Sequence, residues 1–180
     1  LNDLLQNKKI VKVLHASGQD IEIFHNLFGE IPKNIFDTQI AAKLLGFGES
    51  ISYGKLVEHY EGVKLDKSTR YTDWTKRPLK DEQIEYALSD VSYLKGVYGR
   101  MLDELNQKER LNWVLEEMEK IYDEELYFVD PDDCWKKLKI KSKDKKYLAL
   151  IKSLARWRES TAQRVNKPRG WIMRDDGIQE

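Results

Sequence analysis

The stretch KIVKVLHASGQDIEIFHNLFG, residues 9–29, carries the clearest indication of fold class in this chain. Residues 9–15 are apolar and β-branched enough to form a buried strand. A helix from Ser17 to Phe28 follows directly, and Gly29 is a residue type that commonly ends helices. A strand that runs straight into an amphipathic helix is typical of an α/β domain.

The same order repeats once downstream, and after it only helices are predicted. NIFDT (34–38) is a second short strand, and Asp37 is placed to cap a helix over residues 38–45. Two strands that alternate with helices, followed by helices alone, predict an α/β domain that leads into an all-α one. The later helical patterns cover residues 52–60, 81–106 with a break near Gly96–Gly99, 108–125 and 144–165.

The chain has no net charge, with 31 basic and 31 acidic side chains, but the two signs are segregated. Residues 109–133 hold ten acids and two bases, whereas residues 136–170 hold thirteen bases and two acids. A charge run is usually a solvated helix face, yet so large an excess interleaved with aromatic residues favours a polyanionic partner. We therefore predict nucleic-acid contacts in the basic segment, by Lys136, Lys137, Arg156 and Arg158.

Composition excludes several classes of protein. No apolar run approaches the roughly 20 residues that cross a bilayer, and the N-terminus lacks the layout of a secretory signal. The single cysteine, Cys134, excludes an internal disulfide framework and a zinc cluster built on cysteines. We expect a cytoplasmic protein that is a monomer and has no membrane partner.

The residues with the clearest chemical meaning lie in EQIEYALSDVSYL (82–94). Tyr86 and Asp90 are four residues apart, so a helix places the phenol and the carboxylate on one face. A carboxylate that holds a divalent metal, beside a phenol that orients water, suits phosphodiester hydrolysis. Alone, this spacing is more often a core tyrosine beside a solvated aspartate.

Asp20 is the upstream candidate for the same site, because it lies in the first turn of the helix that follows the first strand. Carboxylates placed there can reach the edge of a sheet where α/β active sites form. The alternative is a capping box between Ser17 and Asp20, and the two roles are compatible. His15, His25 and His59 lack metal-ligand spacing and are interpreted as structural.

The loop DKSTRYTDWTKRPL (66–79) runs directly into the helix of Tyr86. Long loops within compact domains are often functional, and we expect this one to line a substrate cleft. Arg70, Lys76 and Arg77 could contact phosphates. Trp74 could stack on a base or pack beneath the loop, and the sequence favours neither.

Four segments taken together resemble ribonuclease D, a member of the DEDD family of 3′–5′ exonucleases. They are LHASGQDIEIF (14–24), IFDTQIAAKLLGF (35–47), LVEHYEGVKLDKSTRYTDWTKRPL (56–79) and EQIEYALSDVSYL (82–94), and the match covers about residues 9–95. The segment LIKSLARWRESTAQRVNKPRGWIMRDDGI (150–178) resembles the opening of the helical HRDC domain. The resemblance implies a partial ribonuclease H-like domain over residues 1–106, a mixed sheet flanked by helices with its first strands missing. A connecting helix and linker (107–143) and the start of an HRDC domain (144–180) would follow.

The family resemblance also implies a metal-dependent exoribonuclease with catalytic Asp20, Tyr86 and Asp90. Asp20 and Asp90 would hold Mg²⁺ or Mn²⁺, two ions in the intact family enzyme, and the substrates would be RNA 3′ ends such as transfer RNA precursors. The family's first two carboxylates, an Asp-x-Glu on an early strand, have no counterpart here. We therefore expect a chain that begins downstream of that strand, with impaired activity and an exposed sheet edge at Ile10, Val11 and Val13.

Three alternatives remain open from the sequence. The chain could be a catalytically inert nucleic-acid-binding module, which the basic segment supports. It could instead be a scaffold that uses the acidic helix 109–125 and the basic helix 144–165 to bind protein or each other. A related exonuclease that acts on DNA, with single-stranded DNA as a partner, is also compatible, because one sequence does not show how a 2′-hydroxyl is recognised.

Overall fold

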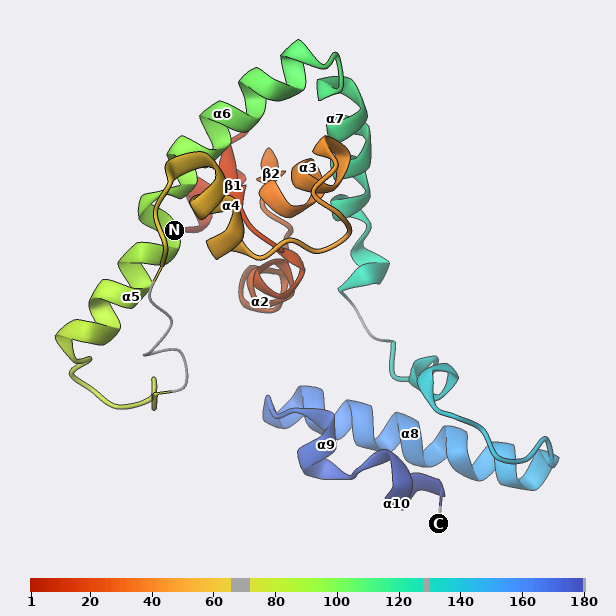
Figure 1. Cartoon of the computed structure of the whole chain (residues 1–180). Helices are drawn as coiled ribbons and strands as arrows, with labels where there is room; N and C mark the ends of the chain where they lie inside the picture. The colour runs from red at the N-terminus through yellow and green to blue at the C-terminus, as the bar shows by residue number, and fades with distance from the viewer. Residues whose placement is uncertain (66–71, 128–129, 180) are drawn as a thin grey trace. The chain divides into compact units, whose positions relative to one another are not determined.

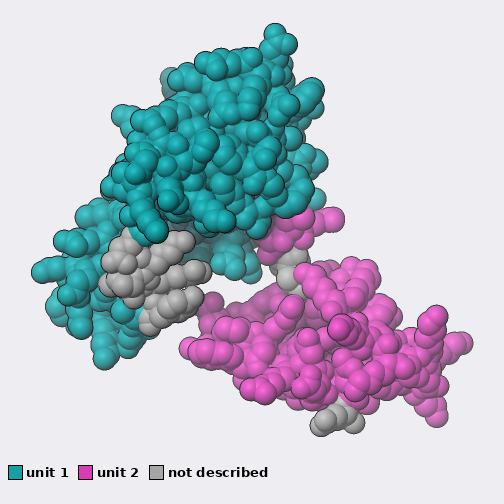
Figure 2. Space-filling view, viewed as in Figure 1, with its two compact units in different colours: residues 1–124 teal, residues 125–180 magenta. Residues whose placement is uncertain are grey.

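A computed structural model gives the fold and describes residues 1–65, 72–127 and 130–179. The chain divides into two compact units, Leu1–Glu124 and Glu125–Glu180 (Figure 2). Each unit has its own core, and each is described separately below. Among the described residues, no helix is both long and apolar enough to span a bilayer.

The first unit is built around two parallel strands, β1 (Lys12–Leu14) and β2 (Ile35–Asp37), with Lys12 opposite Ile35 and Leu14 opposite Asp37. β1 is shorter than the strand expected over residues 9–15. The reason is a turn before it, in which the Ile10 amide donates to the Asn7 carbonyl at 3.2 Å. Ile10 and Val11 are 41% and 38% exposed, whereas Val13 is half-buried.

Helices surround this short sheet (Figure 1). Asp37 caps α3 (Thr38–Leu45) as expected. Gly29, Gly46 and Gly62 end α2 (Gly18–Phe28), α3 and α4 (Tyr53–Glu61) in the left-handed conformation that glycine adopts without strain. The buried apolar residues of the unit include Ile21, Phe36, Leu56, Val97, Met101, Leu105 and Val114. The helices are α1 (Asn2–Gln6), α2 (Gly18–Phe28), α3 (Thr38–Leu45), α4 (Tyr53–Glu61), α5 (Asp81–Ser92), α6 (Leu94–Gln107) and α7 (Leu111–Glu119), with 3₁₀ turns η1 (Lys120–Tyr122) and η2 (Glu124–Leu126) after them.

The helical segment 81–106 breaks at Tyr93, so the expected break near Gly96–Gly99 is wrong. Gly96 lies within α6 instead. A Cβ at this position would collide with the end of the Glu61 side chain of α4, whose carboxylate pairs with Arg100 at 3.2 Å. A larger residue at position 96 would therefore displace the Glu61 carboxylate.

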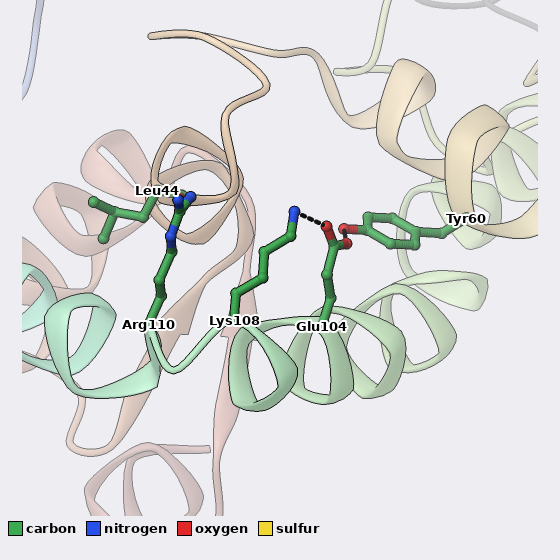
Figure 3. A network of polar contacts seen from close by, with 5 residues as sticks. All are labelled: Leu44, Tyr60, Glu104, Lys108 and Arg110. Atoms are coloured by element: carbon green, nitrogen blue, oxygen red, sulfur yellow. Dashed lines mark hydrogen bonds and ion pairs between the residues drawn. The ribbon is translucent and has the colours of Figure 1, made fainter.

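A polar network fixes the far end of α6 (Figure 3). The Tyr60 hydroxyl donates to one oxygen of Glu104 at 2.6 Å, and Lys108 pairs with the other oxygen at 2.6 Å. The Lys108 hydrogen bond, followed by the Tyr60 hydroxyl, lowers the pKa of Glu104, whereas burial raises the pKa of Tyr60. The Arg110 guanidinium donates to the Leu44 carbonyl at 2.9 Å, which ties the α6–α7 turn to the end of α3.

The second unit is helical. Its longest element, α8 (Lys145–Val165), is capped by Asp144 and ends at Asn166 in the left-handed conformation. The 3₁₀ turn η3 (Cys134–Lys137) and the short helices α9 (Arg169–Ile172) and α10 (Asp175–Gln179) pack against α8. The core contains Cys134, Leu138, Ile151, Ala155 and Ile178.

The division of the chain at residues 106 and 143 stays a prediction. In the structure α7 packs against α3 and β2, so residues 111–119 form part of the first compact unit. The helix expected over residues 108–125 is shorter than predicted, because it turns into η1 at Lys120.

Candidate active site

Asp37, the last residue of β2, organises the carboxyl end of the sheet. One carboxylate oxygen accepts from the Ser17 amide and the Ser17 hydroxyl, both at 2.7 Å. The other accepts from the amides of Ala16 at 3.1 Å and Gln39 at 2.7 Å. This buried carboxylate therefore caps α3 and also fixes the turn between β1 and α2.

Asp20 lies in the first turn of α2, just beyond that turn. Its side chain is exposed, yet burial raises the pKa of Asp20 and the negative charge of Asp37 raises it further. The capping box predicted between Ser17 and Asp20 is wrong, because the Ser17 hydroxyl donates to Asp37 instead. The Asp20 carboxylate is therefore left with a neighbouring like charge, which a bound cation would neutralise.

His15 and Tyr53 connect this edge of the sheet to α5. His15 hydrogen-bonds the Thr38 hydroxyl through Nδ1 at 2.9 Å, and its ring centroid is 5.8 Å from that of Tyr53. The Tyr53 hydroxyl donates to the Ser89 carbonyl at 3.2 Å. Burial, with a smaller contribution from the charge of Asp90, raises the pKa of Tyr53 to about 12. The Tyr53 hydroxyl is therefore protonated at neutral pH and remains a donor to α5.

Tyr86 and Asp90 lie one turn apart on α5, as the spacing predicts. Tyr86 is half-buried and Asp90 is exposed. The ring of Trp74 packs against Tyr86, with ring centroids 5.8 Å apart and planes inclined at 52°. Trp74 is also half-buried, so part of its side chain is exposed to solvent while it packs on Tyr86. Packing and stacking are thus compatible roles for Trp74.

Gln83 attaches the end of the loop to α5. Its side-chain amide donates to the Thr72 hydroxyl at 3.0 Å and to the Asp73 carbonyl at 3.2 Å, while its oxygen accepts from the Lys80 amide at 3.0 Å. The Gln83 side chain is buried, and it places Trp74 beside Tyr86.

The phosphate-contact candidates have different surroundings. Lys76 and Arg77 are exposed, and the Arg77 guanidinium donates to the carbonyls of Trp74 and Lys76, at 2.8 Å and 2.9 Å. Arg70 lies outside the described residues. Arg77 therefore braces the loop in this structure while it remains accessible to a phosphate.

In the second unit, Lys137 is exposed, while Lys136 and Arg156 form exposed ion pairs with Asp133 and Asp132. The expected role of Arg158 in nucleic-acid binding is wrong. Its side chain is 2% exposed and donates to the Met173 carbonyl and the Asp175 carboxylate. Arg158 stabilises the packing of α8 against the C-terminal segment instead.

The donors have the right chemistry for a hard divalent cation, but they are few. Carboxylate oxygens of the kind that Asp20 and Asp90 supply suit Mg²⁺, which keeps several waters and needs few protein ligands. Within the described part of the chain, no group of three or more histidine, cysteine or acidic side chains could hold a metal ion. The charge of Asp37 contributes to the raised pKa of Asp20 and opposes the lowering of the His15 pKa by burial, while the charge of Asp90 contributes to the raised pKa of Tyr53.

Comparison with known proteins identifies the fold around these residues. A family model described as 3′-5′ exonuclease matches residues 1–106, more than half of the chain. The chain belongs to the 3′–5′ exonuclease family. Ribonuclease D of Sphingobium indicum is 46% identical to this exonuclease-family chain over 178 residues, which are 99% of the chain and 46% of that relative.

Solved structures agree with this assignment. Escherichia coli RNase D superposes on the exonuclease-family chain with a TM-score of 0.87 at 33% identity, over 99% of the chain and 48% of that protein. Brucella melitensis NrnC with bound Mg²⁺ shares the fold, with a TM-score of 0.63 at 23% identity, over 79% of the chain and 68% of NrnC. The chain spans about half the length of the curated relatives that it matches.

The sequence did not single out Tyr53 or Gln83 of this exonuclease-family chain, and it assigned Asp37 and His15 purely structural roles. Tyr53 and Ser89 are 36 residues apart, and Asp37 and Ser17 are 20 apart. No local pattern signals such pairs, because each depends on how separate elements pack. The signal for Gln83 was available, since it occupies the third position of α5 where a capping box is common.

Proposed function

We propose that this chain is the core of a ribonuclease D-like hydrolase, which removes nucleotides from the 3′ end of RNA. The observation that carries the proposal is the family match over residues 1–106, which contain Asp20, Tyr86 and Asp90. The substrates would include structured RNA 3′ ends such as transfer RNA precursors, and a divalent metal ion would be required. The similarity to ribonuclease D relatives supports RNA as the substrate.

Asp20, Asp90 and Tyr86 divide the chemistry between them in this proposal. The carboxylates of Asp20 and Asp90 would hold Mg²⁺ or Mn²⁺, two ions in the intact family enzyme, which supply Lewis acidity and lower the pKa of bound water. The Tyr86 phenol would orient the attacking water by a hydrogen bond. Trp74 packs on the Tyr86 ring and would hold the phenol in place, while the exposed part of the Trp74 ring would stack on the terminal base.

The chain alone would turn over slowly, because two carboxylates balance little of the charge of two divalent ions. Each missing ligand removes transition-state stabilisation, on the order of several kcal/mol. The absence of a larger cluster of ligating side chains among the described residues supports this part of the proposal. We propose a monomer in a cytoplasmic, reducing setting, where the buried thiol of Cys134 stays free.

The direct test follows a 5′-labelled oligoribonucleotide with Mg²⁺ and the 180-residue chain. We expect slow shortening from the 3′ end, release of mononucleotides, and no reaction after Asp90→Asn or when the 3′ end carries a phosphate. Internal cleavage, or equal rates for the chain and its Asp90→Asn variant, would contradict the exonuclease. Robust turnover would support the exonuclease activity and contradict the proposed impairment of this chain.

A second candidate function is an inert nucleic-acid-binding module. The observation that favours it is the basic segment of the second unit, whose resemblance to the opening of an HRDC domain we retain as a proposal. RNA binding that is strong at low salt, together with no nucleotide release at any Mg²⁺ or Mn²⁺ concentration, would select this function.

A further inference from the structure

A hollow of about 440 Å³ lies beside the beginning of β2, between that strand, α7 and η1. It is formed by residues of the first unit alone. Asp37, at the other end of β2, belongs to the candidate active site, so the hollow and that site lie at opposite ends of the strand. The proposed catalytic residues do not line it. Its lining residues are Lys8, Lys33, Asn34, Ile35, Leu115, Met118, Glu119 and Tyr122.

The charged side chains that line this hollow are two lysines and one carboxylate, Glu119. Lys8 is exposed and Lys33 is half-buried, and neither forms an ion pair among the residues that the structure describes. The Asn34 side chain donates to the Lys8 carbonyl at 3.0 Å, which holds the Lys8 backbone against the start of β2. Two cations without carboxylate partners, held over one hollow, suit a phosphate group.

The remaining wall of the hollow is aromatic and apolar. The Tyr122 hydroxyl accepts from the Ile35 amide at 3.0 Å, so the ring is held at the outer edge of β2. The Lys33 ammonium lies 6.0 Å from the centroid of that ring. Leu115 beside it is 49% exposed, an uncovered apolar surface within the hollow. A fixed ring next to apolar surface is the kind of platform on which a base stacks.

We propose that this hollow binds one nucleotide, with its phosphate at Lys8 and Lys33 and its base against Tyr122 and Leu115. The nucleotide is either a free nucleoside monophosphate or one unit of a single-stranded RNA whose 3′ end lies elsewhere. The proposal rests on the proposed function only in taking RNA and its products as the available ligands. Binding needs no metal ion, so the site can be tested while hydrolysis is switched off.

Glu119 gives the site a second, independent test. Its carboxylate lines the hollow and is exposed, so it opposes a phosphate there. Removing this charge should strengthen nucleotide binding, whereas removing the lysines should weaken it. Misfolding would weaken binding in every variant, so opposite responses of this kind indicate specific binding at the hollow.

The experiment uses the full chain in EDTA, titrated separately with uridine 5′-monophosphate, a hexauridylate RNA, inorganic phosphate and hexa-aspartate. Amide resonances of Ile35 and Tyr122 report occupancy by nuclear magnetic resonance. We expect saturable shifts with a nucleotide probe, binding about tenfold weaker in Lys8→Gln/Lys33→Gln, and binding about twofold tighter in Glu119→Gln. The matched control Lys64→Gln/Lys95→Gln removes two exposed lysines outside the hollow and should leave the affinity unchanged.

The probes also separate the two sources of nucleotide. Saturation by the monophosphate would indicate a product site, whereas saturation by the RNA alone would indicate a nucleotide within a longer strand. In the second case the hollow double variant should lower the slope of log affinity against log salt by about 0.7, the value for one phosphate contact on a single strand. No shift with either nucleotide probe, equal binding of phosphate or hexa-aspartate, or an unchanged affinity in the lysine double variant would overturn the proposal.

Discussion

At the scale of single residues, two nearby carboxylates have opposite surroundings. Asp37 is buried. It accepts hydrogen bonds from Ser17, which lies between β1 and α2, and from the Gln39 amide in the first turn of α3. Asp20 is exposed and lies within range of the Asp37 charge. The first carboxylate stabilises the fold, while the second is available to a ligand. An exposed carboxylate beside a like charge contributes little to the stability of the fold.

Substitutions at these two positions should therefore differ sharply. Asp37→Ala removes an N-cap and leaves the Ser17 donors unpaired, so we expect the free energy of unfolding to fall by about 3 kcal/mol. Asp20→Asn removes a charge beside a like charge, and it should change stability by less than about 0.5 kcal/mol. Urea denaturation of both variants measures the difference. A larger loss for Asp20→Asn than for Asp37→Ala would refute these roles.

His15 makes stability depend on pH. Burial lowers the pKa of His15, and the charge of Asp37 opposes this shift only in part. The unfolded chain therefore binds a proton more readily than the folded one, so stability is full above about pH 6.5 and declines as the pH falls below it. We expect a steeper decline for the native chain than for His15→Gln between pH 7.5 and 5.5, measured by urea denaturation. If the free energy of unfolding depends on pH in the same way for both proteins, protonation of His15 does not contribute to the pH dependence of stability.

At the scale of elements, two contacts hold the C-terminal end of α6, and they should contribute differently to the stability of the fold. Tyr60 on α4 donates to Glu104, and its side chain is buried against α6. Lys108 pairs with the same carboxylate from the exposed side of the helix, four residues along. Ion pairs of the second kind are screened by water and salt, whereas a hydrogen bond between a buried phenol and a carboxylate is not.

Removing the Tyr60 hydroxyl should cost more than removing the Lys108 charge. Tyr60→Phe keeps the ring and leaves Glu104 without its inner donor, so we expect a loss of about 1–2 kcal/mol in the free energy of unfolding. Lys108→Gln should cost less than about 0.5 kcal/mol. Thermal and urea unfolding of both variants at low and high salt provide the check. Equal losses would indicate that the phenol bond is also screened by solvent.

At the scale of the whole molecule, the first unit exposes two apolar side chains just before β1. The Ile35 amide of β2 is satisfied by the Tyr122 hydroxyl, whereas Ile10 and Val11 lie exposed next to β1. Open edges with apolar side chains invite pairing with other chains. The exposure of Ile10 and Val11 agrees with the expectation drawn from the sequence, whereas Val13, which lies in β1, is half-buried.

A charge at this edge should suppress self-association. Val11→Lys is expected to lower the concentration-dependent light scattering of the chain while its melting temperature stays within about 2 °C. Val165→Lys is a matched control, because Val165 is 44% exposed and lies in the second unit. If both variants lower scattering equally, net charge rather than the β1 edge explains the effect.

The sequence by itself determined the strand–helix order of the first half and the α/β-then-α arrangement, and it selected Asp20, Tyr86 and Asp90 as candidate site residues, which stays a prediction. Helix periodicity, caps and turn glycines are local signals, so a single pass along the chain finds them. The i, i+4 spacing that places Tyr86 and Asp90 one turn apart is likewise a property of one helix.

Tertiary structure alone decided which polar residues are buried and what they bind. It placed Asp37 between two turns, made Tyr53 the link from His15 to α5, and buried Arg158 against Asp175. Gly96, expected at a helix break, lies within α6 beside the Glu61 carboxylate of α4. Burial and hydrogen bonding depend on distances between segments far apart in the chain, and only packing fixes those distances.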